Sequence, residues 1–389
     1  MKRSYNLCIR LQRSRSRTKF RTDSPNHLRP DFSFVTDAPE STTGKVSPVS
    51  QPKHSSNTKR VTSHEVAQRA GVSQSTVSRA FSRDTRLSKT TSERVLRVAN
   101  DLGYKPNAIA RSLSTQRTQI IGVVASYMTN PFFPVVLEAF TQRLHELGWR
   151  VLLFTAGKSN DVDVLLPDVL AYQVDGLIIV TATLSSQMTR EVLQRGIPVV
   201  LFNRYAPGSG ASAVSCANDE GGRMVADELV RAGHRRFAYI AGRPDTSTNV
   251  DRQKGFLERL RELKITDCRV ESGDFTYEAG FAAAQRLLTS SVRPEAIFCA
   301  NDITALGALD AARKLNVRVP EELSVIGFDD IPMGQWAAYD LTTVRQPVED
   351  MIEASIELLL ERVENTDLAS VLKFLPGTLV RRGSARLSP

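Results

Sequence analysis

From Gln119 onward, short runs of consecutive apolar residues alternate with segments whose apolar residues recur at helical spacing. The runs are IIGVV (120–124), VLLF (151–154), GLIIV (176–180), IPVVLF (197–202), FAYIAG (237–242), AIFCAND (296–302) and LSVIGFDD (323–330), and helices are predicted over 133–147, 161–173 and 185–195. Continuous Val/Ile/Leu runs are typical of strands buried on both faces, so this alternation predicts parallel sheets covered by helices. Roughly 270 residues of it exceed one core, so we predict two α/β lobes.

The two predicted lobes also suggest where a ligand would bind. Ligands of open α/β sheets lie beyond the carboxyl ends of the strands. A cleft between two lobes gathers several such ends, so we expect the binding site there.

Charge divides the chain into a basic front and a mildly acidic body. The net charge is +9 over residues 1–60 and +6 over 61–117, whereas residues 118–389 carry −6. Clustered Lys and Arg favour a polyanionic partner, because their contacts with phosphates release counterions. Charge alone does not distinguish DNA from RNA or anionic lipid.

Residues 1–58 are rich in Ser, Thr, Arg and Pro and show no sustained apolar periodicity. We predict that this segment is a disordered basic extension, because it cannot bury enough surface to offset its ordering entropy. Two explanations stay open: a basic arm that adds nonspecific DNA affinity, or an upstream start on a protein that begins nearer Val46 or Val49. Three parts are predicted to follow it. They are a small helical domain over 59–106, a hinge and linker over 107–117, and the two-lobed domain over 118–389.

Residues 61–117 have the pattern of three short helices. Thr62-Ser-His-Glu65 reads as a capping box, and Gly71 supplies a turn. Ser73 can cap a second helix that runs to about Ser82, and Ser88 opens a third that Gly103 stops. Two helices of about eight residues joined by a glycine turn form the helix-turn-helix layout, whose second helix enters the DNA major groove.

With these motifs in order, the sequence resembles the lactose-repressor/galactose-repressor (LacI/GalR) family over about 61–380. The front signature is VTSHEVAQRAGVSQSTVSRAFS followed by ANDLGYKPNAIARSL. The back signature comprises NPFF (130–133), R-x-x-GF (252–256), ANDITALGAL (300–309), IGFDD (326–330) and LTTVRQP (341–347). The resemblance implies a helix-turn-helix headpiece, a hinge helix and a two-lobed sensor domain like a type I periplasmic binding protein.

The resemblance also implies which headpiece residues contact DNA. Gln74, Ser75 and Arg79 take the family's base-reading positions, and their chemistry suits adenine, several acceptors or donors, and guanine respectively. The residues expected to hold phosphates are Thr62, Ser73, Thr76 and Ser78. Ser73 as a plain helix cap and Ser78 as a solvated residue are alternatives.

The segment Asn107-Ala-Ile-Ala-Arg-Ser-Leu113 matches the family's hinge helix. DNA contacts are implied for Asn107, Ala110 and Leu113, with Leu113 as the wedge that opens a central pyrimidine-purine step in the minor groove. Packing of Leu113 on its own domain is the alternative. Arg111 is either a phosphate contact or a solvated charge.

In the sensor domain, the resemblance implies effector-binding residues at strand ends of both lobes. They are Ser126, Phe132, Phe133, Asn203, Arg252, Phe275, Asn301 and Asp329. Asn, Asp and Arg offer donors and acceptors for hydroxyl groups, and an aromatic ring covers the apolar face of a sugar. Arg252 and Asp329 could instead form a structural ion pair. Asp330 is expected to be a helix cap.

Other chemistries find no support in the sequence. It has no G-x-x-x-x-G-K-[ST] phosphate loop, no G-x-S-x-G elbow and no His or Cys spacing typical of zinc. We therefore expect no catalytic residues, cofactor or metal. The scattered cysteines are interpreted as reduced bystanders, and the lack of a signal peptide or an apolar span predicts a cytoplasmic bacterial protein without a membrane partner.

The predicted function is a DNA-binding transcription regulator, most simply a repressor, whose affinity for a palindromic operator is controlled by a sugar-like effector. A homodimer is expected, because no leucine heptad follows the last strand to build a tetramer. The rival classes are a periplasmic sugar-binding protein, which needs a signal peptide and no headpiece, and a sugar isomerase or kinase, which lacks its motifs here. A purine base or a phosphosugar is an alternative effector.

Overall fold

A computed structural model of the chain describes residues 61–81, 86–105, 117–126, 128–156, 162–181 and 187–388. All of these residues belong to a compact unit that spans Arg60–Pro389. The predicted disordered extension 1–58 and the predicted hinge residues Asn107, Ala110 and Leu113 lie outside the described residues.

Three short helices form the headpiece, as the capping and turn residues predict. They are α1 (Ser63–Ala70), α2 (Gln74–Phe81) and α3 (Lys89–Asp101). Their apolar stripes meet in a small core of Val66, Ala67, Ala70, Val77, Ala80, Val95 and Ala99. Phe81 packs edge-to-face on Tyr104, with ring centroids 5.7 Å apart.

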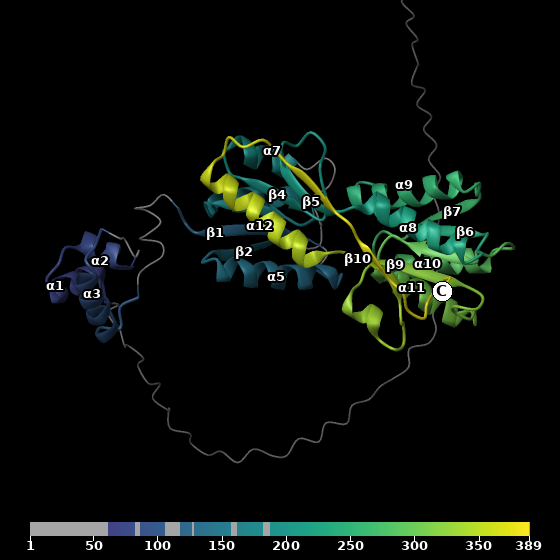
Figure 1. Cartoon of the computed structure of the whole chain (residues 1–389), viewed down its shortest axis with the longest axis horizontal. Coiled ribbons are helices and arrows are strands. Elements are labelled where there is room, and N and C mark those ends of the chain that lie inside the picture. The colour runs from purple at the N-terminus through teal and green to yellow at the C-terminus, as the bar shows by residue number, and fades with distance from the viewer. Residues whose placement is uncertain are drawn as a thin grey trace, which may run out of the picture. The chain divides into compact units, whose positions relative to one another are not determined.

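The rest of the chain forms two lobes, each built on a six-stranded sheet (Figure 1). The N-terminal lobe has strand order β11-β5-β4-β3-β1-β2, and the C-terminal lobe has strand order β12-β10-β9-β8-β6-β7. The strands of the first sheet are β1 (Ile120–Ala125), β2 (Arg150–Thr155), β3 (Gly176–Ile179), β4 (Val199–Phe202), β5 (Ser212–Cys216) and β11 (Leu372–Leu375). The strands of the second are β6 (Phe237–Ala241), β7 (Cys268–Ser272), β8 (Ala296–Cys299), β9 (Ser324–Asp329), β10 (Thr342–Arg345) and β12 (Thr378–Val380).

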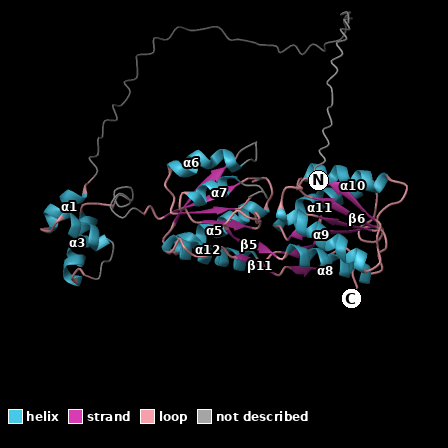
Figure 2. Ribbon diagram, turned by 90° about the horizontal axis from the view of Figure 1, so that it is seen from above, coloured by secondary structure: helices cyan, strands magenta, loops and turns pink. Residues whose placement is uncertain are grey.

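Helices cover both faces of the sheets (Figure 2). They are α5 (Phe132–Glu146), α6 (Leu166–Ala171), α7 (Gln187–Gln194), α8 (Asn218–Arg231), α9 (Ser247–Glu262), α10 (Tyr277–Thr289), α11 (Asp302–Lys314) and α12 (Val348–Glu364), with 3-10 turns at Val162–Leu165 and Pro332–Gln335. Strand β3 shows why its sequence is apolar throughout. Ile178 belongs to the large core cluster with α5, whereas Leu177 and Ile179 belong to a second cluster with α7, so both faces are buried.

The prediction of parallel sheets is confirmed, with one antiparallel strand at an edge. Every pairing is parallel except that of β10 with β12, in which Thr343 lies opposite Val380. An antiparallel edge strand on an otherwise parallel sheet is common in such folds.

The chain passes between the lobes three times: from β5 to α8, from β10 to α12, and from β11 to β12. The first passage is the shortest, because only Ala217 separates β5 from α8. Each lobe is therefore assembled from segments that are distant in the sequence.

Glycines set the close approach of α8 and α9 in the C-terminal lobe. A Cβ atom on Gly255 would lie 2.0 Å from the carbonyl oxygen of Asp219, and one on Gly222 would lie 2.4 Å from the carbonyl oxygen of Arg252. Each helix thus places a glycine against the backbone of the other, with no side chain between them. This contact fixes the position of α9, and with it the position of Arg252.

Candidate functional site: the DNA-facing helix and the interlobe cavity

Side-chain caps define the start of each headpiece helix. Thr62 and Glu65 form the predicted capping box: the Thr62 amide donates to Glu65 Oε2 at 2.8 Å, and Thr62 Oγ1 accepts from the Glu65 amide at 3.4 Å. Gly71 ends α1 in the left-handed conformation with φ of 64°. Ser73 Oγ accepts from the Thr76 amide at 3.2 Å and so caps α2. Satisfying the free amides in this way fixes where α2 begins.

Helix α2 keeps one polar face away from the headpiece core. Its exposed residues are Gln74, Ser75, Ser78 and Arg79, while Val77 and Ala80 are buried. The residues expected to read bases therefore share a side with Ser78. Ser73 Oγ lies 2.8 Å from Ser75 Oγ and 2.9 Å from Thr76 Oγ1, so a cap and a small hydroxyl cluster occupy the start of this face.

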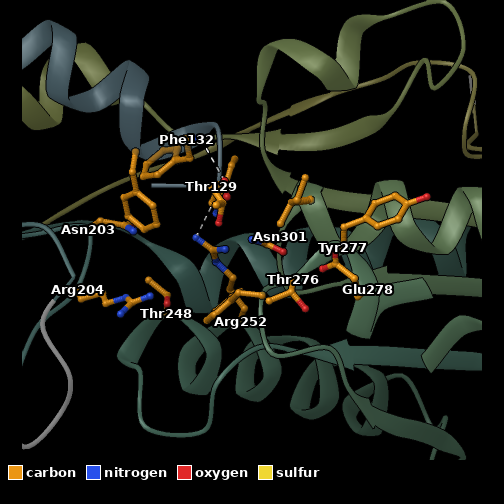
Figure 3. Close-up of a pocket in the computed structure, with 15 residues that line it drawn as sticks. Thr129, Phe132, Asn203, Arg204, Thr248, Arg252, Thr276, Tyr277, Glu278 and Asn301 are labelled. Atoms are coloured by element: carbon orange, nitrogen blue, oxygen red, sulfur yellow. Dashed lines mark hydrogen bonds and ion pairs between the residues drawn. The ribbon is translucent and has the colours of Figure 1, made fainter. Parts of the chain in front are cut away.

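A cavity of about 310 Å³ is lined by residues of both lobes (Figure 3). This volume lies within the range of ligand pockets, roughly 300–1,000 Å³. The wall comprises Thr129, Asn130, Phe132, Phe133, Asn203, Arg204, Thr248, Arg252, Phe275, Thr276, Tyr277, Glu278, Asn301, Ile303 and Asp329. Most of these residues follow β1, β4, β7 and β8 or end β9, so carboxyl ends of strands from both sheets meet at the cavity.

Seven of the eight residues expected to bind the effector line this cavity. The eighth, Ser126, is buried directly after β1 but is not part of the wall, and its Oγ has no hydrogen-bond partner among the described residues.

Arg252 is held on several sides and still faces the cavity. Its Nε donates to Asn218 Oδ1 at 2.7 Å, its Nη1 donates to the carbonyl of Ala300 at 2.6 Å, and its Nη2 lies 3.4 Å from Asp329 Oδ1. The guanidinium carbon lies 3.6 Å from the centroid of the Phe328 ring. A guanidinium carries five N–H groups, so this side chain is fixed in place and has donors left for a ligand.

Two carboxylates lie close together beside the cavity. Asp329 also accepts from Gln346 Nε2 at 2.8 Å. Asp302 is fully buried and accepts from the Ile331 amide at 2.8 Å and from Thr343 Oγ1 at 2.5 Å. Burial raises the pKa of both carboxyl groups, and the charge of Asp329 raises the pKa of Asp302 further. The positive charge of Arg252 works against the rise at Asp329.

Asn301 and Phe275 owe their positions to local backbone features. Asn301 Oδ1 accepts from the Thr304 amide at 3.2 Å and from Thr304 Oγ1 at 2.6 Å, so it caps α11. Its amide nitrogen is the part that remains for a ligand. Phe275 has φ of 57°, and its ring lies so close to Gly242 that a Cβ there would be 2.2 Å from a ring carbon.

A continuous set of hydrogen bonds joins Arg252 to Asn203 through the first passage between the lobes. Asn218, which accepts from Arg252, donates through Nδ2 to Ser215 Oγ at 3.1 Å and to the Cys216 carbonyl at 2.9 Å. Ser215 Oγ donates in turn to the Asn203 carbonyl at 2.8 Å. Two cavity residues on opposite lobes are thus connected by buried side chains.

The expectation that Asp330 is a helix cap is wrong. Its Oδ2 accepts from Arg345 Nε and its Oδ1 accepts from Arg382 Nη2, both at 2.6 Å. These partners follow Asp330 by 15 and 52 positions, so local sequence carried no signal for the double ion pair.

About half of the cavity wall consists of residues that were not expected from the sequence. The additional residues are Thr129, Asn130, Arg204, Thr248, Thr276, Tyr277, Glu278 and Ile303. Several were within reach: Arg204 directly follows Asn203, and Thr248 precedes Arg252 by one helical turn, so it shares that face of α9. The sequence could have indicated these residues, because they are neighbours of predicted site residues at strand ends or on the same helix face.

The part of the chain that the structure describes was also compared with the requirements of a metal site and of a membrane-spanning helix, and it meets neither. No cluster of three or more His, Cys, Asp or Glu side chains there could hold a metal ion. No helix among these residues is long and apolar enough to cross a membrane.

A small helical headpiece with a polar recognition face, followed by two α/β lobes around a cavity, defines a ligand-responsive DNA-binding regulator. Residues 62–107 match the family of bacterial regulatory proteins called the lacI family, and residues 226–385 match a periplasmic binding protein-like domain. Two repressors and one solved structure illustrate the likeness.

The transcriptional repressor PurR of Vibrio atlanticus is 32% identical over 311 residues, which are 78% of this chain and 92% of that protein. The ribose operon repressor of Escherichia coli K12 is 33% identical over 330 residues, which are 83% of this chain and 99% of that protein. The crystal structure of the Lac repressor dimer bound to operator and the anti-inducer ONPF superimposes with a TM-score of 0.76 at 27% identity, over 85% of this chain and all of that one. The protein belongs to the lacI family, and it is a DNA-binding transcription regulator rather than an enzyme.

Proposed function

We propose that the protein is a repressor that binds a palindromic operator as a homodimer, and that a small sugar-like effector in the cavity controls its operator affinity. The observation that carries this proposal is the composition of the cavity wall, which combines buried hydrogen-bonding groups and aromatic rings from both lobes. A ligand that contacts both lobes favours one arrangement of them over others, and differential binding of this kind shifts a conformational equilibrium.

The wall suits a polyhydroxylated ligand. Arg252 supplies donors, Asp329 supplies acceptors, and the amides of Asn203 and Asn301 supply both, while Phe275 offers an apolar ring face. A buried polar group left without its partner costs about 1–3 kcal/mol, so such a site rejects analogues that lack the matching hydroxyl. The names of the ribose operon repressor and of the Lac repressor complex support a sugar-like ligand class.

On the DNA side, we assign base reading to Gln74, Ser75 and Arg79 and phosphate contacts to the hydroxyl residues around them. Two-fold symmetry of a dimer places two recognition helices on inverted half-sites about one helical turn apart. We assign the minor-groove wedge to Leu113 of the partner-paired hinge segment. The Lac repressor dimer on its operator supports this arrangement. A bacterial regulator of this kind acts at the nucleoid in the cytoplasm.

The proposal is tested in two steps with the purified full-length chain. Selection from fragmented host DNA at physiological salt identifies the bound sequence, because DNA affinities depend steeply on salt. The expected result is a short inverted repeat with a central pyrimidine-purine step. Fluorescence anisotropy on that site, with a panel of pentoses, hexoses, sugar acids and sugar phosphates, then measures the effect of each compound.

A change in operator affinity of about 5- to 150-fold by one member of the panel is expected, which corresponds to a coupling free energy of about 1–3 kcal/mol. Diffuse binding without a motif would contradict the operator proposal. Sequence-specific binding that no sugar, charged or neutral, alters would contradict the effector proposal.

A further inference from the structure

The fit of a ligand between two lobes depends on how far apart the walls of its cavity are held. Asn203 belongs to the N-terminal lobe, whereas Thr248 and Arg252 lie on α9 of the C-terminal lobe, and all three line the cavity (Figure 3). Their separation matters, because hydrogen bonds weaken steeply when their geometry is poor. A contact that joins the lobes beside these residues therefore bears on effector binding.

Tyr205 makes such a contact. It lies two residues beyond Asn203 in the N-terminal lobe and is half-buried, without being part of the cavity wall. Its backbone amide donates to Ser247 Oγ at 3.0 Å, and its phenol Oη donates to Asp251 Oδ1 at 3.1 Å. Both acceptors lie on α9, so one residue of the N-terminal lobe holds the C-terminal lobe at two points.

The two acceptors are spaced by one turn of α9. Ser247 and Asp251 are four residues apart and therefore share a face of the helix. The wall residues Thr248 and Arg252 directly follow them in the sequence. Since a helix fixes the direction of each side chain relative to its neighbours, holding the two acceptors also holds the two wall residues.

The ring of Tyr205 has a partner where the lobes are joined. It packs edge-to-face on Phe374, with ring centroids 5.7 Å apart. Phe374 lies on β11, from which the chain passes to β12 in the other lobe. The aromatic contact restricts the ring, and it thereby restricts where the hydroxyl group points.

The protonation states of Tyr205 and Asp251 favour the hydrogen bond between them. Burial, and then the charge of Asp251, raise the pKa of Tyr205 to about 12, so the phenol keeps its proton at neutral pH and remains a donor. Burial also raises the pKa of Asp251, and the hydrogen bond from Tyr205 opposes this rise. When Asp251 is ionised the bond is charge-assisted, and such bonds are roughly twice as strong as those between neutral groups.

A contact between lobes acts on their arrangement rather than on either lobe alone. Its free energy favours the arrangement in which it forms. A ligand that binds this same arrangement then loses less free energy in ordering the two walls, so its affinity is higher.

We propose that Tyr205 is a positioning residue for effector binding, which holds the start of α9 through Ser247 and Asp251. It thereby presents Thr248 and Arg252 to the effector together with Asn203. The inference rests on the proposed function and adds to it a residue outside the cavity wall that sets effector affinity. Tyr205 acts through the two wall residues of α9 and not by contact with the effector.

The first test needs no effector. Hydrogen exchange of the full-length protein without added sugar is compared for the wild type and Tyr205→Phe, which removes only the phenol oxygen. We expect faster exchange in the first turns of α9, beginning with the Val250 amide, which donates to the Thr246 carbonyl, and unchanged exchange in β8. Tyr172→Phe changes an exposed tyrosine of the same lobe and is the matched control. Wild-type exchange of α9 in Tyr205→Phe would overturn the proposal.

The second test measures effector affinity by calorimetry, well below the melting temperature of every variant. The probe is the member of a panel of D-ribose, D-xylose, D-glucose, D-galactose and their phosphates that changes wild-type operator affinity the most. We expect affinity for it to fall about 10-fold in Tyr205→Phe and in Asp251→Ala, since loss of a hydrogen bond to a charged group has effects of this size. The double variant should lose no more than either single variant, because both remove the same bond.

Two further variants sharpen this measurement. Asp251→Asn keeps an acceptor without the charge, so its affinity should lie between those of the wild type and Asp251→Ala. Tyr172→Phe should bind like the wild type. Asp251→Ala also keeps the test decisive if Tyr205→Phe does not fold.

The contrary outcomes separate this inference from the proposed function. A lower melting temperature of Tyr205→Phe with unchanged effector affinity would reduce Tyr205 to a structural role and overturn the inference. Independent losses that multiply in the double variant would also overturn it. If no member of the panel acts on the wild type at its operator, the result counts against the proposed function, and hydrogen exchange then decides whether Tyr205 holds α9.

Discussion

Nη2 of Arg252 lies 3.4 Å from Oδ1 of Asp329, and both side chains are almost fully buried at the wall of the same cavity. The ion pair is therefore part of the cavity wall. Removing one partner of a buried pair leaves an uncompensated charge, which costs about 3–5 kcal/mol in general. Isosteric substitutions keep the shape of the side chain and therefore test the role of its charge with less disturbance of the fold.

Asp329→Asn should uncouple the protein from its effector. The asparagine keeps an oxygen that can accept from Gln346, but it removes the negative charge that Arg252 and the ligand hydroxyls meet. We expect effector affinity to fall about 10- to 100-fold, as for loss of a charge-assisted hydrogen bond of about 1.5–3 kcal/mol. Operator release by the effector, followed by anisotropy, is the measurement. The control is Asp274→Asn, an exposed aspartate two residues beyond β7. A normal effector response of Asp329→Asn would remove this residue from the site.

Arg79→Ala should weaken operator binding and relax one base preference. The side chain is exposed on the polar face of α2, where it can reach a guanine, and a good bidentate contact discriminates by about 1–3 kcal/mol. Arg97→Ala removes the same charge from an exposed position of α3 and serves as the control. Affinities for the operator and for all single-base variants of one half-site separate the two effects. A uniform loss in both variants would mean that Arg79 contacts phosphate only.

Gly255→Ala should destabilise the C-terminal lobe. The added Cβ would lie 2.0 Å from the carbonyl oxygen of Asp219, so α8 and α9 must move apart. Overpacking of this kind costs about 1–3 kcal/mol. Calorimetry should show a lower melting temperature, with weaker effector binding because Arg252 shifts with α9. Gly334→Ala is the control, since its Cβ would make only ordinary contacts at 3.6 Å or more.

The buried Asp302 predicts a pH dependence of stability with a definite sign. Burial raises the pKa of this carboxyl group from 3.8 to about 7, so the folded state keeps a proton that the unfolded state releases. The contribution of Asp302 is therefore fully present below its unfolded pKa and is lost as the pH rises through the folded pKa. Each unit of pKa difference corresponds to about 1.4 kcal/mol.

Asp302→Asn, which resembles the protonated acid, should remove this dependence. Denaturant unfolding at pH 5, 6.5 and 8 should show that the wild type loses stability relative to the variant as the pH increases. A gap between the two proteins that stays constant with pH would mean that Asp302 is ionised throughout.

Much of the fold could be predicted because its signals are local. Val66, Ala67 and Ala70 lie on one face of α1 by spacing alone, and Thr62 with Glu65 marks the start of that helix. Runs such as GLIIV are apolar on both faces because both faces of β3 are buried. The short edge strands β11 and β12 carry no such run, since their residues are mostly exposed or half-buried, and they were not predicted.

The candidate site was harder to predict from the sequence, because residues that are distant in the chain form it. Asn203 and Asp329 were expected from strand ends and the family pattern, and they line the cavity. The ion pairs of Asp330 with Arg345 and Arg382 depend on how β10 and the segment after β12 meet the end of β9. The same holds for Arg204, which lines the cavity together with Phe275 of the other lobe.

Buried hydrogen bonds run from Arg252 through Asn218 and Ser215 to the Asn203 carbonyl. They connect the two lobes beside the short passage at Ala217. A ligand that contacted both Arg252 and Asn203 would act on the two ends of this chain of hydrogen bonds. Sensitivity to the effector can then be set by Ser215, a residue that is not part of the cavity wall. The effector concentration at which such a regulator responds could then change in evolution through the strength of these hydrogen bonds, with the residues that contact ligand and operator unchanged.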